Sequence, residues 1–114
     1  MVDKPGEFEL ILDVFAPLAA DAPGSLNLTD DAAIISPSSD QEVVVTADTI
    51  VEGVHFRSED PPETVGVKAL AVNLSDLAAM GATPHGYTLS AAWPSRTSAT
   101  WITDFATGLM AMQK

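Results

Sequence analysis

Several oxygen-bearing side chains in this sequence have the types and the spacing of a binding site for a hard metal cation. Thr46 and Asp48 are two residues apart in a β-branched run, so both would point to the same face of a strand. Asp31 opens a neighbouring apolar run, and Asn73 and Asp76 are three residues apart on one face of a helical segment. Carboxylates, a hydroxyl and water are the ligands that Mg²⁺ takes, with substrate phosphates completing the shell. The pattern therefore predicts a magnesium site.

Each of these residues also has an ordinary structural explanation. Asp30 and Asp31 suit a turn, and Asp48 suits the loop after a strand. Asp76 could accept hydrogen bonds from a helix N-terminus or from a buried hydroxyl. Acids on three separate elements would need three separate structural explanations, which favours one shared site. In addition, an unpaired carboxylate in an apolar helix is costly, so Asp76 needs a partner. The two histidines, His55 and His85, stay open between packing, exposure and ligand binding.

The composition limits the classes of partner. The 114 residues include 16 Asp+Glu against 5 Lys+Arg, a formal charge of −11, which argues against nucleic acid or an anionic membrane. The same charge would repel a phosphorylated ligand unless a metal cation lay between them. The lack of Cys excludes a disulfide scaffold and a thiolate zinc site. Without a signal-like N-terminus or a membrane-length apolar stretch, we expect a soluble, cytoplasmic chain of one domain or part of one.

Periodicity and capping signals predict three helices that must position these residues. The first presents one apolar face made of Phe8, Ile11, Leu12, Phe15 and Ala19. The second runs from a cap at Asp60 to Met80, with a left-handed cap at Gly81, and is apolar nearly all round, which predicts burial between layers. The third begins at Ser98 and has an apolar face of Trp101, Ile102, Phe105, Leu109 and Met112.

The β-branched and alternating runs at 31–35, 43–48 and 84–91 predict strands. Together with the helices they predict an α+β fold, with a small, mainly antiparallel sheet covered by helices. So short a sheet leaves an edge exposed, and an exposed edge favours pairing with another chain. We therefore expect a homodimer.

Three segments resemble the N-terminal part of the thiamine-monophosphate kinase family. They are residues 30–33 (DDAA), 46–56 (TADTIVEGVHF) and 68–82 (KALAVNLSDLAAMGA), and the opening Gly6-Glu7-Phe8 is also similar. Thr29 stands where many members carry Gly, and Ala47 stands where Thr is frequent. Aminoimidazole ribonucleotide synthetase, selenophosphate synthetase and a hydrogenase maturation factor share the architecture, but they resemble segment 46–56 less.

The resemblance implies ATP-dependent phosphorylation of thiamine phosphate to thiamine diphosphate. It implies that Mg²⁺ is held by the positions that match the family's metal ligands, namely Asp31, Thr46, Asp48 and Asp76. His55 matches a position that contacts the substrate, and we expect Asp30 and Asn73 to support the ligands from beside them.

The resemblance also implies that the sheet pairs with that of a second subunit into a barrel across the homodimer. Because family members are much longer, residues 1–114 are expected to be an N-terminal metal-binding and dimerisation domain that is inactive alone. Two alternatives are an ATP-dependent synthetase module of the aminoimidazole ribonucleotide synthetase type and a non-catalytic dimerisation domain.

Overall fold

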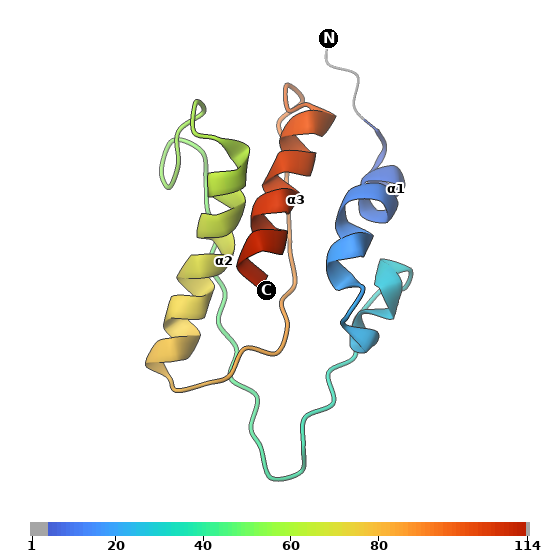
Figure 1. The fold of residues 1–114 in the computed structure, drawn as a ribbon, viewed down its shortest axis with the longest axis vertical. Helices are drawn as coiled ribbons and strands as arrows, with labels where there is room; N and C mark the ends of the chain where they lie inside the picture. Colours follow the sequence, from blue (N-terminus) through green and yellow to red (C-terminus); the bar gives the residue numbers. More distant parts are fainter. Residues whose placement is uncertain (1–4, 114) are drawn as a thin grey trace.

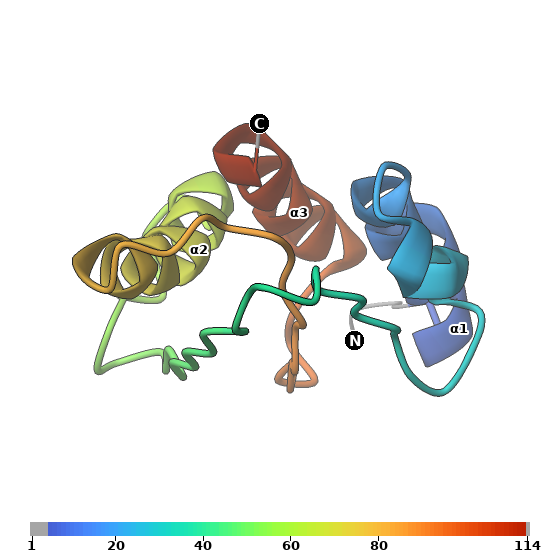
Figure 2. The same cartoon turned by 90° about the horizontal axis from the view of Figure 1, so that it is seen from below.

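The computed structural model describes residues 5–113. An N-terminal helical region that begins with α1 (Glu7–Leu10), the long helix α2 (Pro62–Ala79) and the helix α3 (Ala99–Gln113) lie side by side, with α3 in the middle (Figure 1). These helices form one layer, and the extended segments that connect them lie along one face of it (Figure 2). The layered body measures 53 × 30 × 20 Å. Within residues 5–113 no helix is both long and apolar enough to span a bilayer.

The N-terminal helical region is irregular. After α1 come a π-helical segment η1 (Ile11–Phe15) and two 3₁₀ segments, η2 (Ala16–Ala19) and η3 (Pro23–Leu28). The apolar face predicted here is wrong in part, because Phe8 is 83% exposed and Leu12 is 66% exposed, whereas Leu10 is buried. The wider turn of η1 shifts the side chains out of the 3.6-residue register on which the prediction depended.

The core lies between α2 and α3, which run in the same direction and are connected by the extended segment 82–97 (Figure 1). Val65 and Leu70 of α2 pack with Phe105 and Leu109 of α3. Trp93 lies against this core edge-on to Phe105, with ring centroids 5.5 Å apart. The prediction that α2 is buried all round is wrong: its face toward α3 is buried, while its last turn is largely exposed.

The predicted ends of the helices are confirmed at two of three places. The Ser98 hydroxyl accepts the N–H of Trp101 at 3.0 Å, which is the expected cap of α3. At the end of α2, Gly81 has φ +68°, and the N–H of Ala82 bonds to the carbonyl of Leu77. This is the Schellman pattern, which closes the helix. Asp60, however, does not cap α2, because its carboxylate accepts the N–H of Arg57 instead.

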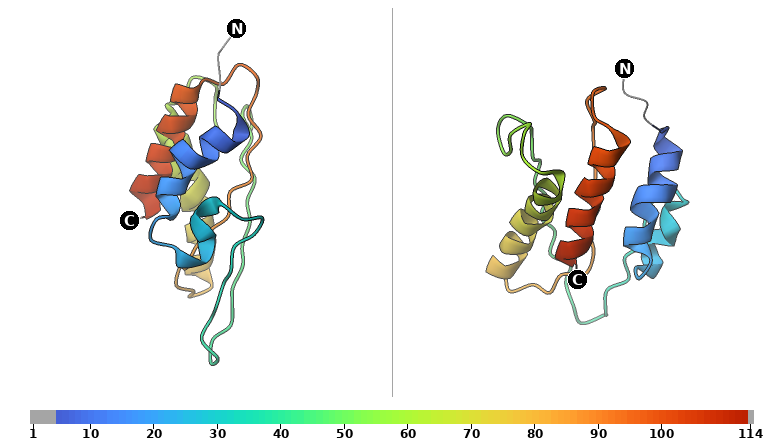
Figure 3. Two further views of the ribbon diagram at one scale, coloured as in Figure 1. Left: turned by 90° about the vertical axis from the view of Figure 1, so that its right-hand side faces the viewer. Right: turned by 45° about the horizontal axis from the view of Figure 1, so that its top comes forward.

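The predicted α+β fold with a sheet is wrong for the described residues. The runs 31–35, 43–48 and 84–91 are extended, but residues 5–113 contain no paired strands apart from one isolated bridge between Glu52 and Phe56. The loop that joins the first two runs projects past the helices at one end of the molecule (Figure 3). β-Branched residues favour an extended backbone, but they do not specify the neighbour that a ladder requires. Extension was therefore predictable, and pairing was not.

The C-terminal end of α3 is hydrogen-bonded to two other parts of the chain, the N-terminal helical region and the extended segment 82–97. The side-chain amide of Gln113 donates to the carbonyl of Leu18, and its oxygen accepts the hydroxyl of Tyr87 at 2.7 Å. Burial raises the pKa of Tyr87 above its ordinary value of 10.0. The phenol of this partly buried side chain therefore keeps its proton, and can donate to Gln113, to a higher pH than an ordinary tyrosine would.

Candidate metal-binding site

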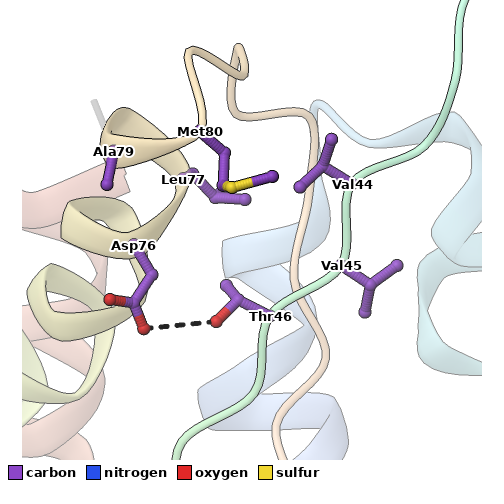
Figure 4. A pocket seen from close by; sticks show the side chains of 7 residues that line it. All are labelled: Val44, Val45, Thr46, Asp76, Leu77, Ala79 and Met80. Carbon is purple, nitrogen blue, oxygen red and sulfur yellow. Dashed lines mark hydrogen bonds between the residues drawn. The ribbon is translucent and has the colours of Figure 1, made fainter.

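The structure brings two of the predicted metal ligands together. The hydroxyl of Thr46, from the extended run 43–48, donates to Asp76 Oδ2 of α2 at 3.4 Å (Figure 4). Thr46 is half-buried and Asp76 is exposed. The pair lies in an open hollow of about 390 Å³ whose remaining lining is apolar: Val44, Val45, Leu77, Ala79 and Met80. A hydroxyl from the extended run and a carboxylate from α2 thus meet across the hollow and are open to a ligand.

The C-terminal end of a helix is a mildly unfavourable position for the carboxylate of Asp76. It lies in the last turn of α2, where the backbone carbonyls carry partial negative charge and no basic side chain is present. The cations of residues 5–113 bond elsewhere: Arg57 pairs with Glu59 and Asp60, Arg96 pairs with Glu52, and Lys68 donates to a backbone carbonyl. The hydroxyl of Thr46 offsets only part of this charge. The site therefore suits a bound cation.

The predicted acids do not form one cluster around Asp76 in the part of the chain that the structure describes. Among residues 5–113, no group of three or more His, Asp or Glu side chains is placed to share a metal ion. Asp48 follows Thr46 on the same extended run and is exposed. Asp31 lines a second hollow, of about 370 Å³, which lies between α1, η1 and the end of η3. Its N–H donates to Asp30 Oδ1 at 2.8 Å, so the side chain of Asp30 shapes this turn.

Asn73 lies on α2 one turn before Asp76. Its Nδ2 donates to the carbonyl of Ala69 at 3.0 Å, while its Oδ1 is buried and has no hydrogen-bond partner. A buried amide oxygen without a partner is unusual and costs free energy. The amide therefore adds a free oxygen acceptor on the helix that carries Asp76.

His55 lies in a turn close to the start of α2. Its Nδ1 accepts the N–H of Val51 at 2.9 Å, and its carbonyl accepts the ammonium of Lys68. Sequence reasoning missed this contact of Lys68, because 13 residues separate it from His55 and no local pattern pairs them. It also missed the ion pair of Arg96 with Glu52, two residues separated by 44 positions.

The sequence was compared with known families and proteins. Residues 29–114 match the family described as AIR synthase related protein, N-terminal domain. The chain is 51% identical over 81 residues to the thiamine-monophosphate kinase of Synechococcus elongatus, covering 70% of this chain and 25% of that protein. It is 42% identical over 105 residues to the enzyme of that name from Caulobacter vibrioides, covering 92% of this chain and 30% of that protein. It is 39% identical over 105 residues to the enzyme of that name from Escherichia coli K12, covering 91% of this chain and 32% of that protein.

The chain thus spans a third or less of the length of these curated relatives. No solved structure matches it.

Proposed function

Because this chain belongs to the family of AIR synthase related proteins, of which it matches the N-terminal domain, we propose that it is the Mg²⁺-binding domain of a thiamine-phosphate kinase. The reaction is the ATP-dependent phosphorylation of thiamine phosphate to thiamine diphosphate. The observation that carries the proposal is the Thr46–Asp76 pair, a hydroxyl and a carboxylate on the wall of an open hollow. The names of the relatives supply the substrate.

The donor set of the hollow fits Mg²⁺. Thr46 and Asp76 provide hard oxygen atoms, which this cation prefers to nitrogen or sulfur. We propose Asp31 and Asp48 as Mg²⁺ ligands of the same chain outside this hollow, which neither of them lines, supported by Asp30 and Asn73, with His55 contacting the substrate. When bound, Mg²⁺ neutralises the phosphate groups of the two substrates and holds them in line. Waters and phosphate oxygens supply most of the ligands of Mg²⁺ in such sites, so two ligands from the protein are enough to hold the ion.

Apart from holding the cation and the substrates, the chain does not have to supply a reacting group for phosphoryl transfer. The β–γ P–O bond of ATP breaks, a new P–O bond forms to a phosphate oxygen of thiamine phosphate, and ADP leaves with the electron pair. The acceptor oxygen is already ionised, so neither a protein nucleophile nor a general base is required. The chain has a formal charge of −11, so it repels the two negatively charged substrates that it must align. We propose that a cation at Asp76 offsets this repulsion.

The metal site can be tested on the chain itself with Mn²⁺, which broadens the NMR signals of nearby nuclei. Low concentrations should first broaden signals of residues 44–48 and 75–80, around Thr46 and Asp76. The exposed pair of Glu59 with Arg57 is the internal control, because a surface acid beside a cation attracts metal weakly. Broadening that spreads evenly over the surface acids would argue against the site.

We further propose that the chain acts as one domain of a longer enzyme, since it spans 25–32% of its relatives' lengths. The longer enzyme should convert thiamine phosphate and ATP to thiamine diphosphate and ADP, measured by chromatography. It should leave an aminoimidazole precursor unchanged. The reverse result would favour a synthetase of the AIR synthase type, which the name of the matched family keeps as the second candidate.

We also propose that the chain forms a homodimer through the exposed apolar side chains of its extended segments. Ile34 is 61% exposed and Ile35 is 59% exposed, and Val43 to Val45 are exposed as well. Covering one such side chain contributes about 1.5–3 kcal/mol. We expect light scattering at micromolar protein to give the mass of two chains, and Ile35→Lys to give one chain with unchanged helical circular dichroism. A clean monomer mass for the unmodified chain would contradict the proposal.

A further inference from the structure

The turn that carries His55 is closed by several hydrogen bonds. The N–H groups of Val54 and His55 both bond to the carbonyl of Val51, at 3.0 and 2.8 Å. The N–H of Gly53 bonds to the carbonyl of Phe56 at 2.7 Å, and Gly53 has φ +84°, a conformation that favours glycine. His55 is therefore held on an ordered turn although its side chain is exposed.

The same turn decides which nitrogen of His55 carries the proton. Nδ1 lies 2.9 Å from the backbone nitrogen of Val51, and a backbone N–H can only donate. Nδ1 must therefore be the acceptor, so the neutral imidazole has its hydrogen on Nε2. Nε2–H is left to donate to a ligand.

Two cations connect the turn to the rest of the fold. The ammonium of Lys68, from α2, donates to the carbonyl of His55. Arg96, from the segment before α3, pairs with Glu52 in the turn. The pair of Arg96 is partly exposed and contributes little free energy on its own. Lys68 is the direct connection between His55 and the helix that also carries Asp76.

We infer that Lys68 is a positioning residue that fixes His55 as a neutral Nε2–H donor toward the phosphorylated substrate. The inference rests on the proposed function for the identity of the ligand, but not for the geometry of the turn. A donor of this kind suits a phosphate oxygen, which can only accept. Because Lys68 and Asp76 share α2, the contact of Lys68 attaches the turn of His55 to the helix that carries the proposed metal ligand.

The test is NMR on the ¹⁵N-labelled chain without any ligand. The unmodified protein should show a scalar coupling across the hydrogen bond between the Val51 nitrogen and His55 Nδ1, and a proton on His55 Nε2. Lys68→Met keeps most of the side-chain length but removes the donor, so the coupling should disappear. Exchange of the Val51 amide hydrogen should then speed up about fivefold to tenfold, as for one lost hydrogen bond. Lys68→Arg should restore both signals.

An Nδ1–H imidazole in the unmodified chain, or a coupling that survives in Lys68→Met, would overturn the inference. If Lys68→Met does not fold, Lys68→Arg and the ligand-free unmodified chain still test the inference, since both should show the coupling and the proton on Nε2. Thiamine phosphate with Mg²⁺ is then added, and the signal of His55 Nε2 should shift while that of His85, the other histidine, does not. A correct turn with no shift would count against the proposed function and leave the role of Lys68 intact.

Discussion

Asp76→Asn should lower phosphoryl transfer by the longer enzyme on the order of 100-fold, roughly 3 kcal/mol of transition-state stabilisation. Asn keeps the volume and one oxygen of Asp, but it removes one negative charge from the proposed cation site. The Thr46 hydroxyl, 3.4 Å from Asp76 Oδ2, can still donate to the amide oxygen. Raising the Mg²⁺ concentration should recover only part of the rate, because the lost charge also positions the phosphates. Thiamine diphosphate formation is the measurement.

The stability of the same variant distinguishes the metal ligand from a structural acceptor. In metal-free buffer, Asp76 opposes the dipole at the end of α2, so Asn should leave the free energy of unfolding unchanged or raise it by about 0.3–1 kcal/mol. If Asp76 served only to accept the hydroxyl of Thr46, the substitution would replace a charged acceptor by a neutral one, so it should cost about 1 kcal/mol or less and leave turnover intact.

Asp104→Asn is the matched control for Asp76→Asn. It makes the same change of charge on α3, away from the hollow, and should alter neither turnover nor cation binding. An Asp76→Asn enzyme that is destabilised yet fully active would overturn the assignment of this residue to the metal.

The parts of the fold that the sequence predicts are those specified within a few residues. Ser98 lies three positions before Trp101, whose N–H it accepts, and Gly81 lies directly beside the helix end that it closes. Both signals depend on the local backbone alone. The cap predicted at Asp60 failed because a competing local partner, the N–H of Arg57, takes its carboxylate.

The parts that the sequence could not predict depend on distant neighbours. The run 43–48 is extended, as its β-branched residues indicate, but no neighbouring strand is paired with it in the described chain. Thr46 and Asp76 are hydrogen-bonded although 30 residues separate them in the sequence. The periodicity of a strand or a helix indicates which side chains share a face, but not which other element that face contacts. The contact of Lys68 with the carbonyl of His55 has no sequence signal at all.

The packing of α2 on α3 depends on two glycines that no local signal identified. A Cβ built on Gly66 would lie 2.1 Å from the carbonyl oxygen of Phe105, and one on Gly108 would lie 2.1 Å from that of Glu63. Both contacts are with backbone atoms, which cannot move aside as a flexible side chain can. A Cβ on Gly66 would also lie 3.2 Å from the Cα of Gly108, so the two helices approach backbone to backbone where these glycines meet, and any side chain at either position must separate them.

Gly108→Ala should accordingly destabilise the chain by about 3 kcal/mol, at the upper end of the range for overpacked cores. The sign is diagnostic, because Ala in place of Gly inside an ordinary helix stabilises it by about 1 kcal/mol. Here the added methyl pushes α3 from α2 and uncovers Leu109, which is 2% exposed. Urea unfolding followed by the fluorescence of Trp93 and Trp101, which lie against Phe105, measures the change.

Gly86→Ala is the matched control, because a Cβ at Gly86 meets nothing within 4 Å, and its effect should stay within about 0.5 kcal/mol. Gly66→Ala should behave like Gly108→Ala. The double variant should lose less than the sum of the two, because helices already separated by one methyl accommodate the second more easily. If Gly108→Ala were as stable as the unmodified chain, the close approach of α2 and α3 would be wrong. The orientation of α2, which places both Lys68 and Asp76, would then have to be revised with it.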